Sequence, residues 1–551
     1  MLSILFRIVF SPLFWIGLFG IQLLNKLALR NSGVLEVVLD GSKSQKHPLW
    51  FRALESAAAE PRIRAVHLKI ESLGLGWAEL QSLRDCIQRI SKSGTPVVAS
   101  MESGDTPSLF LASACDEIVL APLGGVLLGG IGLQLKFFGE AMERLGLKFE
   151  VVSAGDYKSA AEPVSRAFAS RPNREALQAL VADLQAQLRA GIAEGRGVDE
   201  NELQERMEEG ILTSEQALDA GLVDALLYPK GLEKRLEERL GEKPRVVSAA
   251  RFLKRLAWKR RYQTLFRKRP RVQVIHLEGA IVRDAPKWSR KSQISQEESL
   301  DVLEALIQRP PKAVVLVVDS PGGSALVSDL IWEAVGRLNQ ETPVVACFSN
   351  VAASGGYYLS AGCRAIVAQP MTLTGSIGVI SGKLVTGGAL AKFGVFSERV
   401  SGAAGTSLLG SDRPLSQQQR ALLTHHVREI YAAFKKRVED GRAMGADEVE
   451  AVAQGRVWSG QQAHKAQLVD ELGGVAEALS RACELAEISL EEARLTYKKV
   501  ERPKPLWTRF VGQSEAGLAM LVDRSLSAQA ETLIQHPSEP LAIWPLHLHL
   551  D

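Results

Sequence analysis

One serine of this chain lies in a turn where its hydroxyl could act as a nucleophile. Ser354 belongs to the sequence Ala-Ala-Ser-Gly-Gly-Tyr at 352–357, directly after the apolar run 344–348. A serine between alanines and glycines is sterically open, as a group that attacks a carbonyl carbon must be. A serine at this position could equally cap the N-terminus of a helix. The motif alone therefore leaves a catalytic and a structural role open.

A second glycine-rich turn could supply backbone donors to such a reaction. The sequence Asp-Ser-Pro-Gly-Gly-Ser at 319–324 follows the apolar run 314–318 and precedes a helical pattern at 325–338. Paired glycines let backbone N–H groups approach a ligand, and the N-terminus of a helix favours negative charge. A plain tight turn is the alternative. The turn does not read as a phosphate-binding loop, because the chain has no Gly-x-x-x-x-Gly-Lys-[Ser/Thr] sequence.

A serine nucleophile also needs a base. Histidine is the familiar choice, but His276 lies in an apolar strand pattern and His425 and His426 lie in a helical one. A lysine is the remaining standard base. Lys158 stands out, because the stretch 151–163 (Val-Val-Ser-Ala-Gly-Asp-Tyr-Lys-Ser-Ala-Ala-Glu-Pro) runs from a strand end into small residues. A solvated charge is the ordinary role of any single lysine, so the residues alone leave this assignment open.

The elements that must position these motifs recur along the chain. Residues 65–74 (Ala-Val-His-Leu-Lys-Ile-Glu-Ser-Leu-Gly) match residues 313–322 (Ala-Val-Val-Leu-Val-Val-Asp-Ser-Pro-Gly), an interval of about 248 residues. Late in each half, Leu-Val-Asp at 222–224 matches Leu-Val-Asp at 468–470. The interval is far longer than that of a solenoid repeat. Spacings that persist through both halves indicate a duplicated domain.

Each half has the pattern of an α/β domain. Short runs rich in β-branched residues, such as 314–318, 344–346 and 365–367, alternate with helical stretches. Two of these stretches, 173–193 and 416–442, carry apolar residues at helical spacing. Short apolar strands between amphipathic helices predict a buried parallel sheet.

Composition bounds the remaining possibilities. The chain has 551 residues, of which 46% are hydrophobic and 23% are charged, so two to four globular domains are expected. A net charge of +3 is too balanced for a general nucleic-acid binder. The five cysteines form no Cys-x-x-Cys pair, and their spacing suggests neither a zinc site nor a disulfide framework.

The N-terminus predicts a membrane anchor. The 17 residues 8–24 carry no charge, which is close to the roughly 20 apolar residues that a spanning helix needs. A cleaved signal peptide is the main alternative, but its apolar region should end in a small-x-small site. Here the run ends in Gln-Leu-Leu-Asn-Lys at 22–26. We therefore expect an uncleaved transmembrane helix within residues 1–29.

A basic stretch separates the two halves. Residues 251–271 hold ten lysines or arginines and no acidic residue, interleaved with apolar side chains. A linker helix with a solvated face is one interpretation. Contact with anionic lipid headgroups is the other, and it is natural for a body held near a bilayer.

Four short motifs occur in order along the chain: Tyr-Lys-Ser-Ala at 157–160, followed by Glu-Pro at 162–163, then Asp-Ser-Pro-Gly-Gly at 319–323, Ala-Ser-Gly-Gly-Tyr at 353–357 and Thr-Gly-Ser-Ile-Gly at 374–378. On a duplicated chain of this length they resemble the signal peptide peptidase A family, in its long, membrane-anchored bacterial form. The resemblance extends to about residue 500. It implies two tandem Clp/crotonase-like domains, each a ββα superhelix, and a serine endopeptidase that degrades remnant signal peptides with a Ser/Lys dyad. Such a mechanism requires no metal and no cofactor.

The resemblance also assigns roles to individual residues. It implies that Ser354 is the nucleophile, that Lys158 is the general base, and that the hydroxyl of Ser376 orients the lysine. The candidates for oxyanion-hole donors are the backbone N–H groups of Gly322, Gly323 and Gly355.

The repeat gains an explanation from these roles. In an ungapped match, Thr106 stands opposite Ser354 and Thr406 stands opposite Lys158. Gly130 stands opposite Ser376 if a gap of two residues is allowed. Each half has thus kept one component of the dyad and lost the other, and a site that needs both halves is the simplest account.

The expected organisation follows from the anchor, the repeat and the resemblance. We expect an anchor at 1–29, an N-terminal half at 30–250 with the base, a basic linker at 251–271, a C-terminal half at 272–500 with the nucleophile, and a tail of unknown role at 501–551. The resemblance implies a homotetramer on the periplasmic side of the bacterial inner membrane, with signal peptides and other peptides as substrates. Two other functions remain open: a catalytically inactive peptide-binding scaffold, and a crotonase-type acyl-CoA enzyme.

Overall fold

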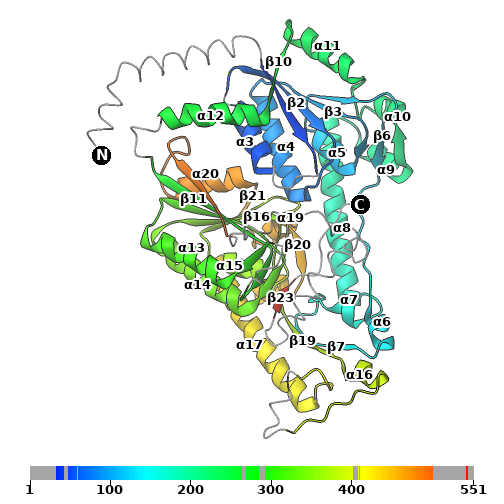
Figure 1. Cartoon of the computed structure of the whole chain (residues 1–551), viewed down its shortest axis with the longest axis vertical. Coiled ribbons are helices and arrows are strands. Elements are labelled where there is room, and N and C mark those ends of the chain that lie inside the picture. The colour runs from blue at the N-terminus through cyan, green and yellow to red at the C-terminus, as the bar shows by residue number, and fades with distance from the viewer. Residues whose placement is uncertain are drawn as a thin grey trace, which may run out of the picture. The chain divides into compact units, whose positions relative to one another are not determined.

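The computed structural model describes residues 33–41, 47–58, 60–263, 269–284, 292–400, 408, 410–500 and 541–543 (Figure 1). These residues divide into two units. Unit 1 takes its described residues from Met1–Leu75, Leu83–Gly130 and Leu188–Arg267, and unit 2 takes its own from Gly76–Ser82, Ile131–Gln187 and Lys268–Asp551.

Unit 1 is built on a parallel sheet whose strands are rich in valine and isoleucine. Its order is β10-β1-β2-β3-β5-β9, and all the pairings in it are parallel. Alternate and consecutive apolar side chains of these strands are buried, as expected for a sheet covered on both faces. The strands are β1 (Gly33–Leu39), β2 (Ile63–Ile70), β3 (Val97–Met101), β5 (Glu117–Leu120), β9 (Ala225–Leu226) and β10 (Arg245–Ser248).

Helices and a small second sheet complete unit 1. The second sheet has the order β4-β6-β8. These elements are α3 (His47–Ala58), α5 (Thr106–Ala112), α9 (Glu200–Glu209), α10 (Ser214–Asp219), α11 (Pro229–Leu240), α12 (Ala249–Gln263), β4 (Gly104–Asp105), β6 (Gly125–Leu128) and β8 (Gly210–Thr213). Two longer helices, α4 (Trp77–Lys92) and α8 (Arg171–Arg196), contribute residues to both units.

The main sheet of unit 2 is also parallel, except for the antiparallel pairing of its edge strand β20 with β18. The order is β20-β18-β16-β14-β11-β22, and β17 and β21 extend it from β16. The strands are β11 (Arg271–Glu278), β14 (Ala313–Ser320), β16 (Val344–Ala353), β17 (Ala365–Ala368), β18 (Leu373–Gly375), β20 (Val457–Ser459), β21 (Glu471–Leu472) and β22 (Arg494–Lys499). Helices α13 (Gln296–Gln308), α14 (Ala325–Glu341), α15 (Gly355–Ser360), α17 (Gln417–Arg442), α18 (Ala446–Val452), α19 (Gly460–Lys465) and α20 (Val475–Leu485) accompany them. The predicted α/β fold is confirmed.

A second sheet of unit 2 joins segments that are far apart in the sequence. Its order is β13-β12-β15-β23-β19-β7. The strands are β7 (Lys148–Ala154), β12 (Ala280–Val282), β13 (Gln293–Ser295), β15 (Gly322–Ser324), β19 (Val379–Val385) and β23 (Leu541–Ile543). β7 pairs with β19 along its whole length, from Ala154 opposite Val379 to Lys148 opposite Val385. Because of this pairing, residues 131–187 belong to unit 2 although they lie in the first half of the sequence.

The structure describes parts of the predicted linker and tail but not the predicted anchor. The predicted anchor at 1–29 lies outside the described residues, and within the described part of the chain no helix is long and apolar enough to cross a membrane. Part of the basic stretch forms α12. The tail, which offered no readable signal in the sequence, contributes β23 to unit 2.

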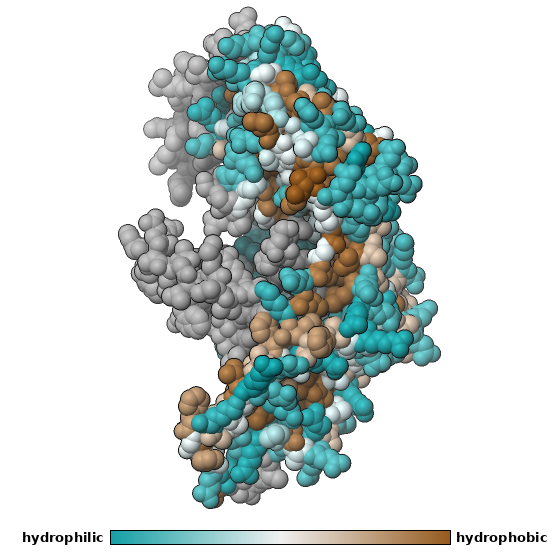
Figure 2. Space-filling model, turned by 90° about the vertical axis from the view of Figure 1, so that its right-hand side faces the viewer, coloured by the Kyte–Doolittle hydropathy of each residue, from teal (hydrophilic) through white to brown (hydrophobic). Residues whose placement is uncertain are grey.

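Several large apolar side chains are exposed. Figure 2 shows hydrophobic surface between hydrophilic regions on one face of the molecule. In unit 2, the exposed residues include Phe393, Phe396 and Val400, which are 84%, 81% and 97% exposed. In unit 1 they include Leu123 and Ile211.

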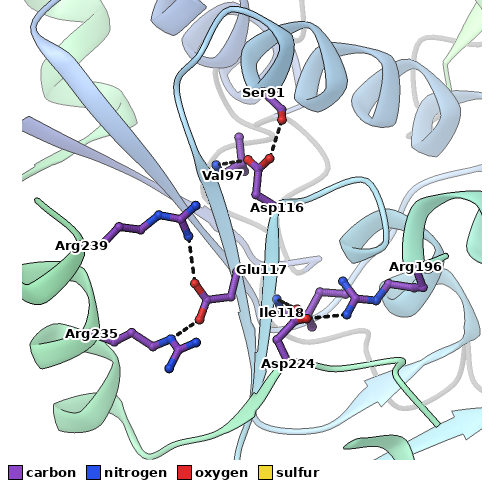
Figure 3. Close-up of polar contacts among 9 residues, drawn as sticks. All are labelled: Ser91, Val97, Asp116, Glu117, Ile118, Arg196, Asp224, Arg235 and Arg239. Atoms are coloured by element: carbon purple, nitrogen blue, oxygen red, sulfur yellow. Dashed lines mark hydrogen bonds and ion pairs between the residues drawn. The ribbon is translucent and has the colours of Figure 1, made fainter.

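The duplication is visible in one polar contact that occurs in both units. In unit 1, a carboxylate oxygen of Asp224 accepts the backbone N–H of Ile118, and the other accepts from Arg196 (Figure 3). In unit 2, Asp470 accepts the N–H of Ile366 and a guanidinium N–H of Arg442. Each set joins a helix, a strand and the Leu-Val-Asp sequence that the repeat analysis matched.

Candidate active site

Ser354 and Ser376 follow two neighbouring parallel strands. Ser354 comes directly after β16 and Ser376 directly after β18, and these strands pair in register up to Ala353 opposite Gly375. The backbone N–H of Ser354 donates to the carbonyl of Gly375 over 2.8 Å. The two serines therefore leave the sheet side by side at its carboxyl edge, where ligands bind in many α/β proteins.

The hydroxyl of Ser354 does not cap a helix. Ser354 occupies the N-cap position of α15, but its side chain makes no capping hydrogen bond. Its φ angle is 55°, a left-handed conformation that a residue with a side chain rarely adopts. Such strain is concentrated at functional sites, because the surrounding structure must hold it in place. The structural role left open by the sequence thus does not account for this side chain.

Lys158 provides the partner of that hydroxyl. Its Nζ lies 2.7 Å from Oγ of Ser354, 2.9 Å from the carbonyl oxygen of Ser376 and 3.0 Å from Oγ of Ser376. All three side chains are buried: Lys158 is 6% exposed, Ser376 1% and Ser354 not at all. The three residues that the sequence singled out, from segments about 200 residues apart, therefore form one cluster within unit 2.

Burial sets the protonation of the lysine. Desolvation lowers the pKa of Lys158 well below its ordinary value, because a buried site disfavours the charged ammonium. A neutral amine has two N–H groups and one lone pair. If the two N–H groups donate to the carbonyl and hydroxyl oxygens of Ser376, the lone pair is left to accept the proton of Ser354. The geometry thus suits a general base.

Ser376 is itself held in a strained conformation. Its φ angle is 51°, and it follows Gly375, whose φ is 77°. Its backbone N–H donates to the carbonyl of Arg456 over 2.7 Å. This anchoring directs both oxygens of Ser376 at the amine of Lys158.

Two glycines enclose the lysine closely. A Cβ atom on Gly378 would lie 3.1 Å from Cδ of Lys158, and one on Gly455 would lie 2.6 Å from its backbone nitrogen. The neighbouring Gln454 accepts the N–H of Tyr157 with its backbone oxygen and that of Asp156 with its side chain. The sequence analysis did not identify these residues as part of the site. Gly378 is the last residue of the motif at 374–378, and Gly455 matches Gly210 in the repeat, whereas Gln454 carried no signal.

The candidate oxyanion donors lie beside the nucleophile. A Cβ atom on Gly355 would lie 3.2 Å from the backbone nitrogen of Gly323, so these two backbones approach closely. Gly322 has a φ of 103°, and its N–H donates to Oγ of Ser320 over 3.2 Å. All three glycines are buried next to Ser354 in sequence or in space.

A carboxyl group supports the strand that carries the nucleophile. Asp319, near the end of β14, accepts the N–H of Val351 over 3.0 Å. Burial raises its pKa to about 7, with a smaller contribution from Glu79. Asn350 also donates to Glu79, over 2.9 Å. These contacts fix β16 just before Ser354 without reaching the reacting atoms.

The described residues contain no group of three or more His, Cys, Asp or Glu side chains placed to hold a metal ion. The five cysteines are buried and unpaired with one another. The groups that meet at the candidate site are the hydroxyls of Ser354 and Ser376 and the amine of Lys158.

Comparison with known proteins finds similarity to one peptidase family in both halves of the chain. The model of peptidase family S49 matches residues 89–242 and 337–489. The chain is 32% identical over 522 residues to a chloroplastic serine protease SPPA of Arabidopsis thaliana, covering 92% of this chain and 76% of that protein. It is 26% identical to Protease 4 of Haemophilus influenzae and 28% identical to Protease 4 of Salmonella typhi. These matches cover 79% of this chain and 72% and 71% of the relatives, respectively.

Proposed function

This chain belongs to peptidase family S49, and on that premise we propose that it is a serine endopeptidase that degrades signal peptides with a Ser354–Lys158 dyad. The observation that carries the proposal is the 2.7 Å approach of Nζ of Lys158 to Oγ of Ser354, with both groups buried. Neither of the two alternative functions accounts for a buried amine placed at a strained serine.

The reaction proceeds in two stages, acylation of Ser354 and hydrolysis of the acyl-enzyme. Oγ of Ser354 attacks the carbonyl carbon of the scissile bond while its proton passes to the neutral amine of Lys158. The negative charge that develops on the carbonyl oxygen is stabilised by backbone N–H groups. Lys158 then gives the proton to the leaving amine, and an acyl-enzyme on Ser354 remains. In the second stage, Lys158 takes a proton from a water molecule as the water attacks the ester carbonyl. Lys158 then returns this proton to Oγ of Ser354 as the C–O bond breaks and the peptide leaves with a new carboxyl group.

The three glycines contribute differently to this step. The N–H of Gly322 is engaged with Ser320 in its own turn. Gly323 and Gly355 approach each other beside Ser354. We therefore assign the oxyanion hole to the N–H groups of Gly323 and Gly355, with Gly322 shaping the turn. Ser376 has no bond to break or form, and its part is to orient the lysine.

The domain fold, the oligomeric state and the membrane location of the protein are further parts of the proposal. We propose that each half is a Clp/crotonase-like ββα superhelix and that the protein is a homotetramer. We also propose that residues 1–29 anchor it in the bacterial inner membrane, with the catalytic body on the periplasmic side. The uncharged run 8–24 supports the anchor, and the recurrence of the Asp224 contact at Asp470 supports the paired domains.

A serine-reactive fluorophosphonate probe tests the proposal. We expect the probe to label Ser354 and to fail on Ser354→Ala, and we expect Lys158→Ala to lose at least about 10³-fold in labelling rate and in signal-peptide cleavage. The controls are Ser349→Ala, on the strand that precedes the nucleophile, and Lys148→Ala, exposed at the far end of β7. Both variants should behave like the unchanged protein. Peptide binding without any labelling would instead support the inactive scaffold. Full turnover by Lys158→Ala would exclude the dyad.

A further inference from the structure

The segment 454–458, which reads Gln-Gly-Arg-Val-Trp, lies between the turns of Lys158 and Ser376. At one end, Gln454 binds the backbone of the two residues that precede Lys158. At the other, the backbone carbonyl of Arg456 accepts the N–H of Ser376 over 2.7 Å. The backbone of this segment therefore joins the turn of the base to the turn of the residue that orients it.

The side chain of Arg456 contacts two aromatic rings. Its guanidinium carbon lies 5.3 Å from the centre of the Tyr157 ring and 4.6 Å from that of Trp458. A guanidinium group within about 6 Å of a ring centre is attracted by the negative face of the ring. Tyr157 directly precedes the base, whereas Trp458 lies opposite Thr374 in the ladder of β20 and β18, two residues before Ser376. We call the set of Tyr157, Arg456 and Trp458 the Arg456 stack.

Further contacts hold the two rings in place. The hydroxyl of Tyr157 donates to a carboxylate oxygen of Glu175 on α8 over 3.3 Å. The indole N–H of Trp458 donates to the carbonyl of Val452, at the end of α18, over 2.9 Å. A Cβ atom on Gly375 would lie 2.7 Å from Cδ1 of Trp458, so the indole ring packs against the backbone of that glycine. Each ring is thus fixed to its own part of the structure, and the guanidinium group couples them.

We propose that Arg456 is a positioning residue of the peptidase, whose guanidinium group couples the two rings and thereby holds the amine of Lys158 at the hydroxyl of Ser354. The inference rests on the proposed function. The two reacting groups follow strands of different sheets, β7 for the lysine and β16 for the serine, so their 2.7 Å approach needs links between those sheets. A displacement of about 1 Å at a catalytic group can lower a rate about 100-fold. Arg456 acts through the two rings and takes no part in bond formation or cleavage.

The first half of the chain keeps the backbone of this segment with other side chains. Gly-Ile-Leu-Thr-Ser at 210–214 matches Gly-Arg-Val-Trp-Ser at 455–459, and the first glycines have φ angles of 79° and 78°. β8 pairs antiparallel with β6, as β20 does with β18. Ile211 stands at the position of Arg456 and is 70% exposed. The turn and the ladder therefore form without a guanidinium group in the half where a threonine stands opposite the nucleophile. This difference favours a role of the stack in the site over a role in the ladder.

Cleavage of a signal peptide and the rate of fluorophosphonate labelling test the inference on the full chain. Arg456→Met keeps an apolar stem without the guanidinium group, and we expect kcat and the labelling rate to fall about tenfold or more, with KM nearly unchanged. Arg456→Lys keeps a cation that can face the rings and should recover part of the loss. The matched control is Arg437→Met, which removes a guanidinium group 3.9 Å from the centre of the Trp332 ring. This variant should lower the thermal midpoint and leave kcat unchanged.

The pH dependence of labelling separates positioning from charge. Tyr157→Leu removes one ring of the stack and no charge, yet it should reproduce the loss of kcat. Its acid limb should move to higher pH, because burial is what lowers the pKa of Lys158 and a looser enclosure admits water. In the double variant with Arg456→Met, the two losses should be much less than multiplicative. The charged side chains on the neighbouring turn and helices, which these variants leave unaltered, are Asp156, Glu175, Lys435 and Glu450.

Each outcome decides the inference. It is confirmed by a loss of kcat in Arg456→Met and Tyr157→Leu that Arg437→Met does not share. It is overturned if Arg456→Met cleaves and labels like the unchanged chain, or if Arg437→Met loses kcat equally. It is also overturned if Arg456→Lys is fully active and Tyr157→Leu is unchanged, because the charge alone then acts. Should Arg456→Met not fold, Tyr157→Leu decides the result. The proposed function fails separately, since it requires cleavage and labelling by the unchanged chain.

Discussion

The amine of Lys158 is surrounded by oxygens of two serines, and burial alone shifts its pKa. A neighbouring carboxylate would favour the ammonium and hold the proton on the base. Here the base becomes available through desolvation, so its protonation depends on the closeness of its enclosure. A change that admits water should therefore raise the pKa of Lys158 towards its ordinary value and reduce activity at neutral pH.

The pH dependence of kcat/KM follows from this shift. Activity requires the neutral amine, so it should rise with pH along an acid limb whose midpoint lies well below 10.4, the ordinary pKa of lysine. Lys158→Arg should be inactive at every pH, because guanidinium does not deprotonate in proteins. Ser376→Ala should lose about fivefold in kcat/KM, the equivalent of one hydrogen bond of about 1 kcal/mol, and its acid limb should move to higher pH. An acid limb near 10 in the unchanged protein would contradict the assignment.

Asp319 gives a second pH signature, in stability. Its pKa is raised to about 7 in the folded protein, so the folded state binds a proton more tightly than the unfolded state does. Its contribution to the free energy of unfolding is therefore present below about pH 4 and is lost as the pH rises to about 7. The unfolding free energy of the unchanged protein, relative to that of Asp319→Asn, should fall over this range in urea titrations. Asp301→Asn, which alters an exposed carboxylate on α13, should show no such trend.

At the scale of elements, the site depends on one long-range pairing and on small residues that admit it. The ladder of β7 and β19 brings Lys158 to the serines, and Gly455 lets the lysine backbone approach. Gly455 has a φ of 78° and no room for a Cβ atom. Gly394 has a φ of 73°, but a Cβ atom there would meet nothing within 4 Å. Comparing an alanine substitution at Gly455 with one at Gly394 therefore separates the effect of crowding from the effect of backbone strain.

Gly455→Ala should lower kcat by about 100-fold, because a displacement of about 1 Å at a catalytic group has an effect of that size. Gly394→Ala is the matched control. It should cost about 1–2 kcal/mol of stability from the strained φ angle, with kcat unchanged. Steady-state kinetics and thermal melts measure both quantities. Equal losses of kcat in the two variants would show that Gly455 acts through backbone strain alone.

Helices and strands with a local pattern of apolar residues could be predicted from the sequence. The predicted helix at 173–193 is α8, and the apolar runs at 314–318 and 344–346 lie in β14 and β16. The family and the peptidase activity, inferred from four motifs, are confirmed by the family match. The catalytic roles of the site residues stay predictions.

Other features had no local signal. β23 is three residues long and forms only by pairing with strands more than 150 residues away. The enclosure of Lys158 by Gly378 and Gly455 likewise depends on tertiary contacts, which no periodicity in the sequence reveals. The transfer of residues 131–187 to unit 2 follows from the β7–β19 ladder, and the repeat alone assigns this segment to the first half.

At the scale of the whole molecule, exposed apolar side chains favour association of several copies of the chain. Phe393, Phe396 and Val400 are almost fully exposed within a short segment of unit 2. Clustered apolar surface of this kind is typical of interaction sites, and closed symmetry is the usual form of homo-oligomers. Association through such surface would bury it in the assembled protein.

Light scattering should give a mass four times that of the 59.9-kDa chain for the detergent-purified protein. The double variant Phe393→Ser and Phe396→Ser should shift the protein towards smaller species, since burying each phenylalanine stabilises an interface by roughly 1.5–3 kcal/mol. Sedimentation velocity measures the shift. A stable, fully active monomer of the unchanged chain would refute the tetramer.

One of the two strained serines, Ser376, stands opposite a glycine in the other half of the chain. At a positive φ angle, serine is less stable than glycine, so random change at such a position tends to end in glycine unless selection retains the hydroxyl. Ser376 keeps its side chain at a φ of 51°, whereas the position opposite it in the first half is Gly130, with a φ of 75°. Gly130 is therefore the residue type that tolerates this backbone conformation best, whereas Ser376 keeps a side chain that contacts Lys158. The first half keeps the Arg196–Asp224 contact of the shared scaffold. At the position opposite Ser376 it has glycine, the residue that adopts a positive φ angle at the lowest cost in free energy.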